Sequence, residues 1–164
     1  MADKIKSGLV AAWLGAALFF SAVVAPSAFM VLRQFNLANA NEIAGTIVSR
    51  TLTVVNISGF VIGLVLLAAV FFKTTGPSLR ELLALAVLTS STAVGHWVVA
   101  ARMLALRAAM TIPIDAVGAG DPRRQSFDTL HHYSVGLLSA AMIAAIVTII
   151  LFGTQARTTR PFRK

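Results

Sequence analysis

The stretch FDTLHHYSVGLL, residues 127–138, holds two of the three histidines of the chain. In a helix, Phe127, Leu130, His131 and Ser134 lie on one face by the i, i+3, i+4, i+7 rule. We therefore expect His131 to point into a helix bundle. It would serve there either as a structural histidine or as a ligand for a metal, a tetrapyrrole or an anionic group.

The other two histidines have different surroundings. His132 follows Asp128 by four positions, so the two side chains are predicted to pair on the helix surface. His96 lies about 9 Å along a helix from Arg102, and at that depth it should face protein. This difference in depth disfavours a haem bound by both His96 and His131. A tetrapyrrole or metal site that uses one of these two histidines stays open, so the cofactor is unknown.

The composition is typical of a membrane protein. Hydrophobic residues make up 57% of the chain and charged residues 12%, against about 25% charged in soluble domains. The net charge of +8 comes from basic residues beside apolar runs, which is the membrane pattern and disfavours nucleic acid as a partner. The absence of cysteine excludes disulfides and thiol chemistry.

Four long apolar runs must position these side chains. They predict transmembrane helices at about residues 8–32, 42–72, 79–110 and 125–152. No segment alternates with period two, so the fold class is predicted to be all-α. We expect one domain, residues 1–164, that forms an integral membrane four-helix bundle with up-down-up-down connections and a basic C-terminal tail at 154–164.

The first run begins like a signal peptide, but Pro26 directly follows the best cleavage site, Val23-Val24-Ala25. We expect a retained helix that is loosened near Pro26. Gly59 and Gly63 form a small-xxx-small pair that indicates close helix packing, although chance explains it equally well. Helix caps are predicted at Asn39 or Asn41, at Ser78, and at Gly153, where the last helix should end.

Basic residues favour one orientation in the membrane. Eight of them fall on the side of the termini and six on the other side, so both termini are predicted to be cytoplasmic. The eight are Lys4, Lys6, Lys73, Arg80, Arg157, Arg160, Arg163 and Lys164, and the six are Arg33, Arg50, Arg102, Arg107, Arg123 and Arg124.

Helix arithmetic places several polar groups at one depth. Arg50 is about 35 Å from Lys73, and Arg102 is about 33 Å from Arg80. His131 lies at the same level, Arg33 just follows the first span, and Glu42 is near. Arginines at such positions often only anchor a helix to the headgroups, although an inward Arg50 paired with Asp128 or an anion is equally plausible. The predicted ligand-binding residues are His131, Ser134, Arg50, Arg102, Arg33 and Asp128.

These residues suggest binding rather than catalysis, since no phosphate loop, zinc-protease motif or nucleophile motif is present, and enzyme activity is uncertain. The leading hypothesis is a bacterial inner-membrane protein with a polar pocket at its non-cytoplasmic face, for binding or transport of a small molecule or metal. One alternative is an accessory subunit that packs against membrane-protein partners or copies of itself in the lipid bilayer. Another is a redox protein that holds a tetrapyrrole through one histidine.

The pattern F-x-x-L-H-x-x-S, at Phe127, Leu130, His131 and Ser134, resembles the transmembrane-protein-205-like family of four-helix membrane proteins. VVAPSAF (23–29) and EIAGTIVSR (42–50) are similar to the family's first-helix exit and second-helix start. The resemblance implies four spans and a polar cluster with His131 and Ser134, and a role in handling metals or drugs. The family often has Asn where this chain has Leu138, so that part of the cluster is reduced here.

Overall fold

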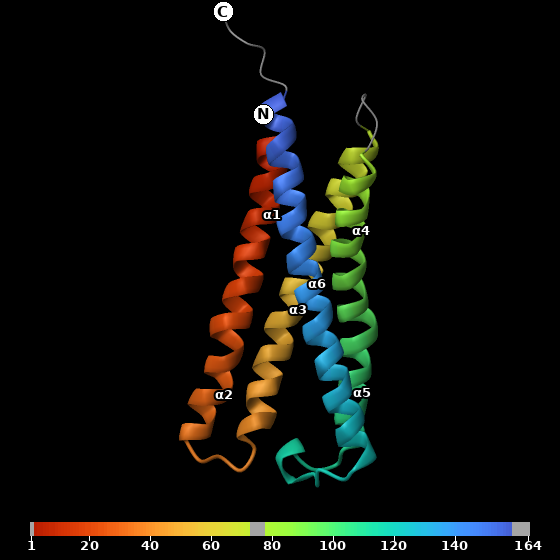
Figure 1. Ribbon diagram of the computed structural model, residues 1–164. Helices are drawn as coiled ribbons and strands as arrows, with labels where there is room; N and C mark the ends of the chain where they lie inside the picture. The colour runs from red at the N-terminus through yellow and green to blue at the C-terminus, as the bar shows by residue number, and fades with distance from the viewer. Residues whose placement is uncertain (1, 73–77, 159–164) are drawn as a thin grey trace, which may run out of the picture.

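The computed structural model describes residues 2–72 and 78–158, and all regular structure in them is helical (Figure 1). Two of the four long helical rods are interrupted by a wider π-helical turn. The elements are α1 (Ala2–Phe19), η1 (Phe20–Val24), α2 (Ala25–Gln34), α3 (Ala40–Phe71), α4 (Leu79–Ala93), η2 (Val94–Ala100), α5 (Ala101–Ala109), η3 (Ile114–Ala116) and α6 (Pro122–Thr158). The predicted all-α fold is confirmed.

All four rods are long and apolar enough to cross a membrane. Their outer faces expose large apolar side chains, including Phe19 (60% exposed), Leu104 (69%) and Ile143 (63%). Water would penalise so much exposed apolar surface, whereas lipid tails would not. The chain is therefore a small integral membrane protein.

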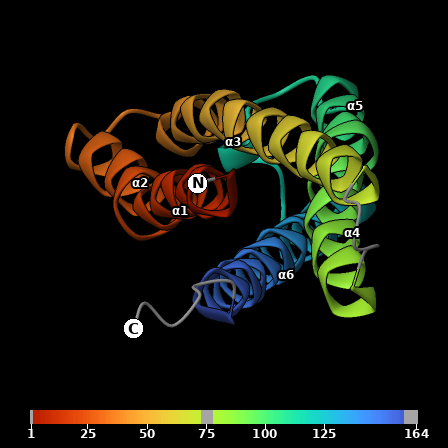
Figure 2. The same ribbon diagram turned by 90° about the horizontal axis from the view of Figure 1, so that it is seen from above.

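The helices form a ring in the order α1, α3, α4, α6, as seen along the bundle (Figure 2). The start of α1 and the end of α6 lie at one end, where the Lys6 ammonium is 5.8 Å from the centre of the Phe152 ring. Towards the other end, α2 packs against α3, whereas the first turns of α6 pack against α5. The first half of α6 thus has fewer neighbours than its second half, which packs against both α1 and α4.

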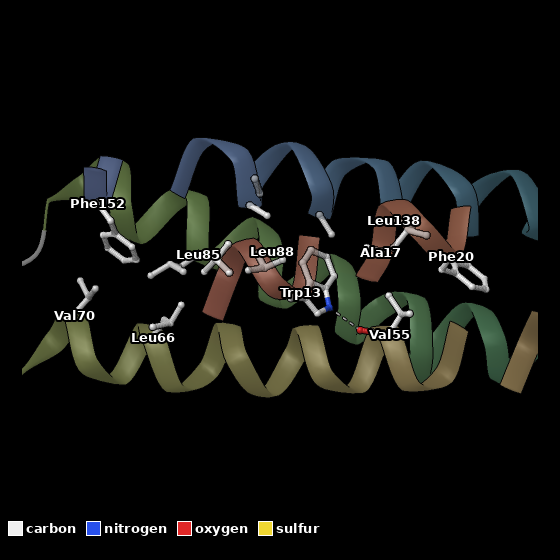
Figure 3. Packing of buried hydrophobic residues seen from close by; sticks show 14 residues of the cluster. Trp13, Ala17, Phe20, Val55, Leu66, Val70, Leu85, Leu88, Leu138 and Phe152 are labelled. Carbon is white, nitrogen blue, oxygen red and sulfur yellow. Dashed lines mark hydrogen bonds between the residues drawn. The ribbon is translucent and has the colours of Figure 1, made fainter. Parts of the chain in front are cut away.

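The core runs along the bundle and includes an interhelical hydrogen bond (Figure 3). The buried indole of Trp13 donates from Nε1 to the carbonyl oxygen of Val55 at 2.9 Å. A Cβ atom on Gly59 would lie 2.7 Å from this indole, and one on Gly63 would collide with the Thr89 hydroxyl. The small-xxx-small pair therefore packs inside the bundle, with one glycine against α1 and the other against α4.

Proline explains the first π-helical turn. Pro26 lacks a backbone N–H, and its ring crowds the carbonyl four residues earlier, so the helix widens over Phe20–Val24 instead of ending. The expected loosening near Pro26 is confirmed. The turn η2 follows Ala93 without any proline and has Gly95 as its second residue.

The helix ends follow most of the predicted caps. Ser78 and Glu81 form a capping box at the start of α4, and Asn39 is the N-cap of α3 without a side-chain bond. The prediction that Gly153 ends the last helix is wrong, because α6 continues to Thr158. Gly153 keeps the right-handed helical conformation instead of the left-handed one that a glycine cap requires, so the helix continues through it. The predicted break at Gly76-Pro77 lies outside the described residues.

Candidate functional site

Charged groups gather at the end of the bundle where α2, α3, α5 and the start of α6 meet. The centre is an ion pair between Arg107 of α5 and Glu42 in the first turn of α3, with Nε 2.9 Å from Oε1. Their side chains are only 17% and 29% exposed, so solvent screens the pair weakly. The other Glu42 oxygen accepts the backbone N–H of Ile114 at 3.1 Å. One carboxylate thus joins α3, α5 and the connection that follows α5.

A second carboxylate extends this network. Asp115 of η3 accepts hydrogen bonds from the amide of Asn41 and from the backbone N–H of Glu42. Arg33 at the end of α2 donates from Nε to Oδ1 of Asn41 at 3.0 Å. The Asp115 carboxylate lies next to the first turn of α3, so its negative charge is also stabilised by the positive end of that helix dipole. This hydrogen-bond network therefore extends from α2 to the connection between α5 and α6, which is the third connection between the rods.

Packing fixes the Arg107 guanidinium in place. A Cβ on Gly45 would lie 2.8 Å from Nη2 of Arg107, so a larger residue there would force the end of the arginine side chain to shift. On its other side the guanidinium is 5.8 Å from the Phe127 ring of α6, within range of a cation–π contact. Sequence reasoning treated Arg107 as a simple anchor and missed Asn41 and Asp115. The sequence feature that could have indicated this ion pair is Glu42, because a carboxylate at the end of a membrane span requires a partner.

Asp121 directly precedes α6 and accepts a hydrogen bond from a backbone N–H of its first turn. Its carboxylate accepts the backbone N–H of Arg123 at 2.7 Å and a guanidinium N–H of the same residue at 2.8 Å. These bonds from Arg123 lower the pKa of Asp121 from 3.8 to about 2. Arg124 turns the other way and donates to the carbonyl oxygen of Ile114 at 3.0 Å. The third connection is therefore held from α3 and from α6.

Arg102 and Arg50 lie apart from this network. Both side chains are exposed, and neither makes an ion pair or hydrogen bond with another residue of the described part. Arg50 therefore does not face inward to Asp128 as one interpretation expected. Arg102 borders an open groove of about 510 Å³ between α5 and α6, and its other lining residues are Pro122, Gln125, Ser126, Thr129 and Leu130.

The face expected at FDTLHHYSVGLL is only partly buried. Ser134 is 9% exposed, and Phe127 and Leu130 are half-buried, but His131 is exposed. The expectation that His131 points into the bundle is therefore wrong. The buried face of this stretch is instead centred on Ser134 and Leu130. Leu138 is 8% exposed and fills core space, as an apolar residue should.

His132 and Asp128 are neighbours in a different way than expected. Nδ1 of His132 lies 2.7 Å from the backbone carbonyl oxygen of Asp128, not from its carboxylate. His96 lies in η2, and its Nδ1 is buried. Within residues 2–72 and 78–158, no three metal-ligating side chains come together. The metal sites considered at His131 and His96 therefore belong to no group of three such side chains in the part of the chain that the structure describes.

A family model matches residues 8–111, described as a domain of unknown function (DUF4149). The match spans the first three rods and includes both Glu42 and Arg107, but it ends before Asp115 and α6. It contains VVAPSAF and EIAGTIVSR, whereas F-x-x-L-H-x-x-S lies outside it. No curated protein and no solved structure matches the chain. Because the matched residues make up more than half of its length, the chain belongs to this family, the domain of unknown function DUF4149.

Proposed function

We propose that this membrane protein binds a small anionic molecule, for storage or transport, in the groove beside Arg102. The single observation that carries the proposal is a groove of about 510 Å³ bordered by an exposed guanidinium that lacks a carboxylate partner. Most other charges at this end are satisfied within the protein, because Arg107 pairs with Glu42 and Arg123 with Asp121. A ligand at Arg102 therefore meets an unneutralised positive charge.

The charge of this end also bears on the choice between an anion and a metal. The carboxylates of Glu42, Asp115 and Asp121 are engaged by protein N–H groups, and the groove is lined by no carboxylate. Divalent cations require several free oxygen or nitrogen ligands. An anion needs only the guanidinium and nearby amide donors such as that of Gln125. Of the two ligand classes in the leading hypothesis, small molecule or metal, we therefore propose a small molecule that carries a negative charge.

The wider predicted site stays part of the proposal. His131, Arg50 and Asp128 are exposed. Arg33 is also exposed and donates to Asn41, whereas Ser134 is buried. We propose that the groove faces the non-cytoplasmic side of a bacterial inner membrane and that both termini are cytoplasmic. We also propose that the chain is of the transmembrane-protein-205 type within its family. The interpretations as an accessory subunit or a tetrapyrrole protein remain predictions, and the internal use of Gly59 and Gly63 removes one argument for the former.

Native mass spectrometry of the full chain, released from phosphatidylcholine nanodiscs, would test the proposal. The two probes are glycerol 3-phosphate as a soluble anion and phosphatidylglycerol as a lipid anion. We expect one of these two probes to bind with one molecule per protein. Arg102→Ala should raise the dissociation constant of that probe about tenfold, because a charge-assisted hydrogen bond is lost.

Arg80→Ala is the matched control, since Arg80 is an exposed arginine at the opposite end of the same rod. It should leave binding unchanged. Equal loss in Arg80→Ala and Arg102→Ala would indicate nonspecific attraction of anions and would refute the site. Loss in His131→Ala or Arg50→Ala would extend the site to those residues. A Soret band in the purified protein would instead favour the tetrapyrrole interpretation.

A further inference from the structure

A second polar site lies within the bundle, away from the groove. Nδ1 of His96 is buried and has no hydrogen-bond partner among the described residues. An imidazole nitrogen that is neither hydrated nor bonded carries a desolvation penalty, and this penalty is greatest in hydrocarbon. Such a group in a membrane helix usually marks a place where something binds.

A buried carboxamide on α3 lies at nearly the same level of the bundle. Asn56 of α3 is 4% exposed, and its Nδ2 is 3.3 Å from the position that a Cβ on Gly95 would occupy. Its side chain makes no hydrogen bond with another residue of the described ranges. Gly95 directly precedes His96, so two polar side chains without partners come from facing helices at nearly one level. Neither satisfies the other.

The backbone at this level is also unusual. His96 belongs to the π-helical turn η2, and such turns inside α-helices occur frequently at functional sites. One aromatic ring contacts His96, and a second ring contacts the first. The ring of Trp97 is 4.9 Å from that of His96 and 4.8 Å from that of Phe60, each in an edge-to-face arrangement. Trp97 is 52% exposed, so this pair opens towards lipid rather than water.

These surroundings define the class of ligand. The level of His96 is about 9 Å below that of Arg102, inside the apolar span, where a charged ligand is unfavourable. A metal would need further ligands, and the described residues supply no group of three. Imidazole and carboxamide N–H groups donate well to a carbonyl oxygen. The aromatic rings of Trp97 and Phe60 suit a ligand whose remaining part is flat and apolar.

We propose that His96 and Asn56 form an intramembrane site for a neutral, lipid-soluble molecule with a ring carbonyl, the quinone class. Both side chains donate to the carbonyl oxygen, and the ring lies along Trp97, entering from the bilayer. The proposal concerns binding alone and requires no electron transfer. It is independent of the anion groove, so Arg102→Ala should leave it intact.

Nitrogen NMR would test the site in the full chain, because the protein has only three histidines. The protein, labelled with ¹⁵N-histidine, is placed in phosphatidylcholine nanodiscs and titrated with decylubiquinone, and His96→Gln assigns the signal. We expect a saturable shift of the His96 Nδ1 resonance. His132, which is exposed and bonded to a backbone carbonyl, serves as the internal control and should not shift.

Asn56→Leu, of similar volume, removes the second donor. It should raise the dissociation constant about five- to tenfold, since one hydrogen bond is lost. The wild-type titration decides the matter even if this variant does not fold. A His96 signal without a saturable shift would overturn the proposal, as would equal shifts at His96 and His132, which indicate partition into lipid. Unchanged affinity in a folded Asn56→Leu would overturn the two-donor site.

Discussion

Replacement of Gly59 by alanine tests the packing between the first and second spans. The new Cβ would lie 2.7 Å from Cε2 and Nε1 of Trp13 and 2.8 Å from Cζ2. Real Cβ contacts are essentially never this short, so something must move. The indole is 3% exposed and is tied to the Val55 carbonyl by a hydrogen bond of 2.9 Å. It therefore cannot withdraw without losing that bond.

The expected cost follows from two terms. Overpacking of a tight core costs about 1–3 kcal/mol, and an interhelical hydrogen bond in a membrane contributes about 0.6 kcal/mol. Alanine also favours the helix over glycine by up to about 1 kcal/mol. Gly136→Ala gains the same helix term, but no atom lies within 4 Å of its Cβ position. The two variants should therefore differ in free energy of unfolding by about 2–4 kcal/mol.

The measurement is reversible unfolding of the full chain in mixed micelles, followed by helical circular dichroism. Gly59→Ala should unfold at lower denaturant than wild type, and Gly136→Ala at equal or higher denaturant. Trp13→Phe shortens the opposing ring, so it should partly restore the stability of Gly59→Ala in a double-mutant cycle. If the two glycine variants agree within about 0.5 kcal/mol, the inferred contact between α1 and α3 is wrong.

Three further predictions concern the polar end. Glu42→Gln leaves Arg107 (17% exposed) without its carboxylate and should lower the free energy of unfolding by about 1–3 kcal/mol, whereas Arg50→Gln should change it by less than about 0.5 kcal/mol in the same assay. The folded pKa of Asp121 (about 2) lies below its unfolded value (3.8), so its small stabilising effect is present above about pH 4 and is lost as pH falls towards 2; carboxyl ¹³C NMR should show this midpoint move up in Arg123→Gln. Since the chain has no cysteine, Ala119→Cys should react with an impermeant maleimide in intact cells and Gly153→Cys only after lysis, and the reverse pattern would contradict the proposed orientation.

The helices were predictable because apolar runs and lipid leave the backbone little choice. In hydrocarbon every backbone group must bond within its own helix, so length and hydropathy suffice to place a span. The predicted end of the last helix at Gly153 was wrong, because a glycine can end a helix but does not have to. The turn η2 was not predicted, since no proline marks it.

The ion pairs and hydrogen bonds of the polar end could not be predicted from the sequence. Helix rise predicts one level for Arg50, Arg102, His131 and Arg33, with Glu42 near it, but rise says nothing about rotation or about which helices touch. His131 shows the consequence. It is one residue from half-buried Leu130 and three from buried Ser134, and yet its own side of α6 is exposed. Asp115 could not be placed, because it lies on a connection whose path the helices determine.

The ion pair between Glu42 and Arg107 has a consequence for biogenesis. Its partners are 65 positions apart, and they lie on the second and third spans, so they can meet only after both spans have inserted. Apolar segments drive insertion itself, and the pair adds little to that step. A chain whose third span has not crossed exposes an unpaired carboxylate at Glu42, whereas a completed one does not. The pair is therefore a chemical difference between a molecule whose third span is in place and one whose third span is not.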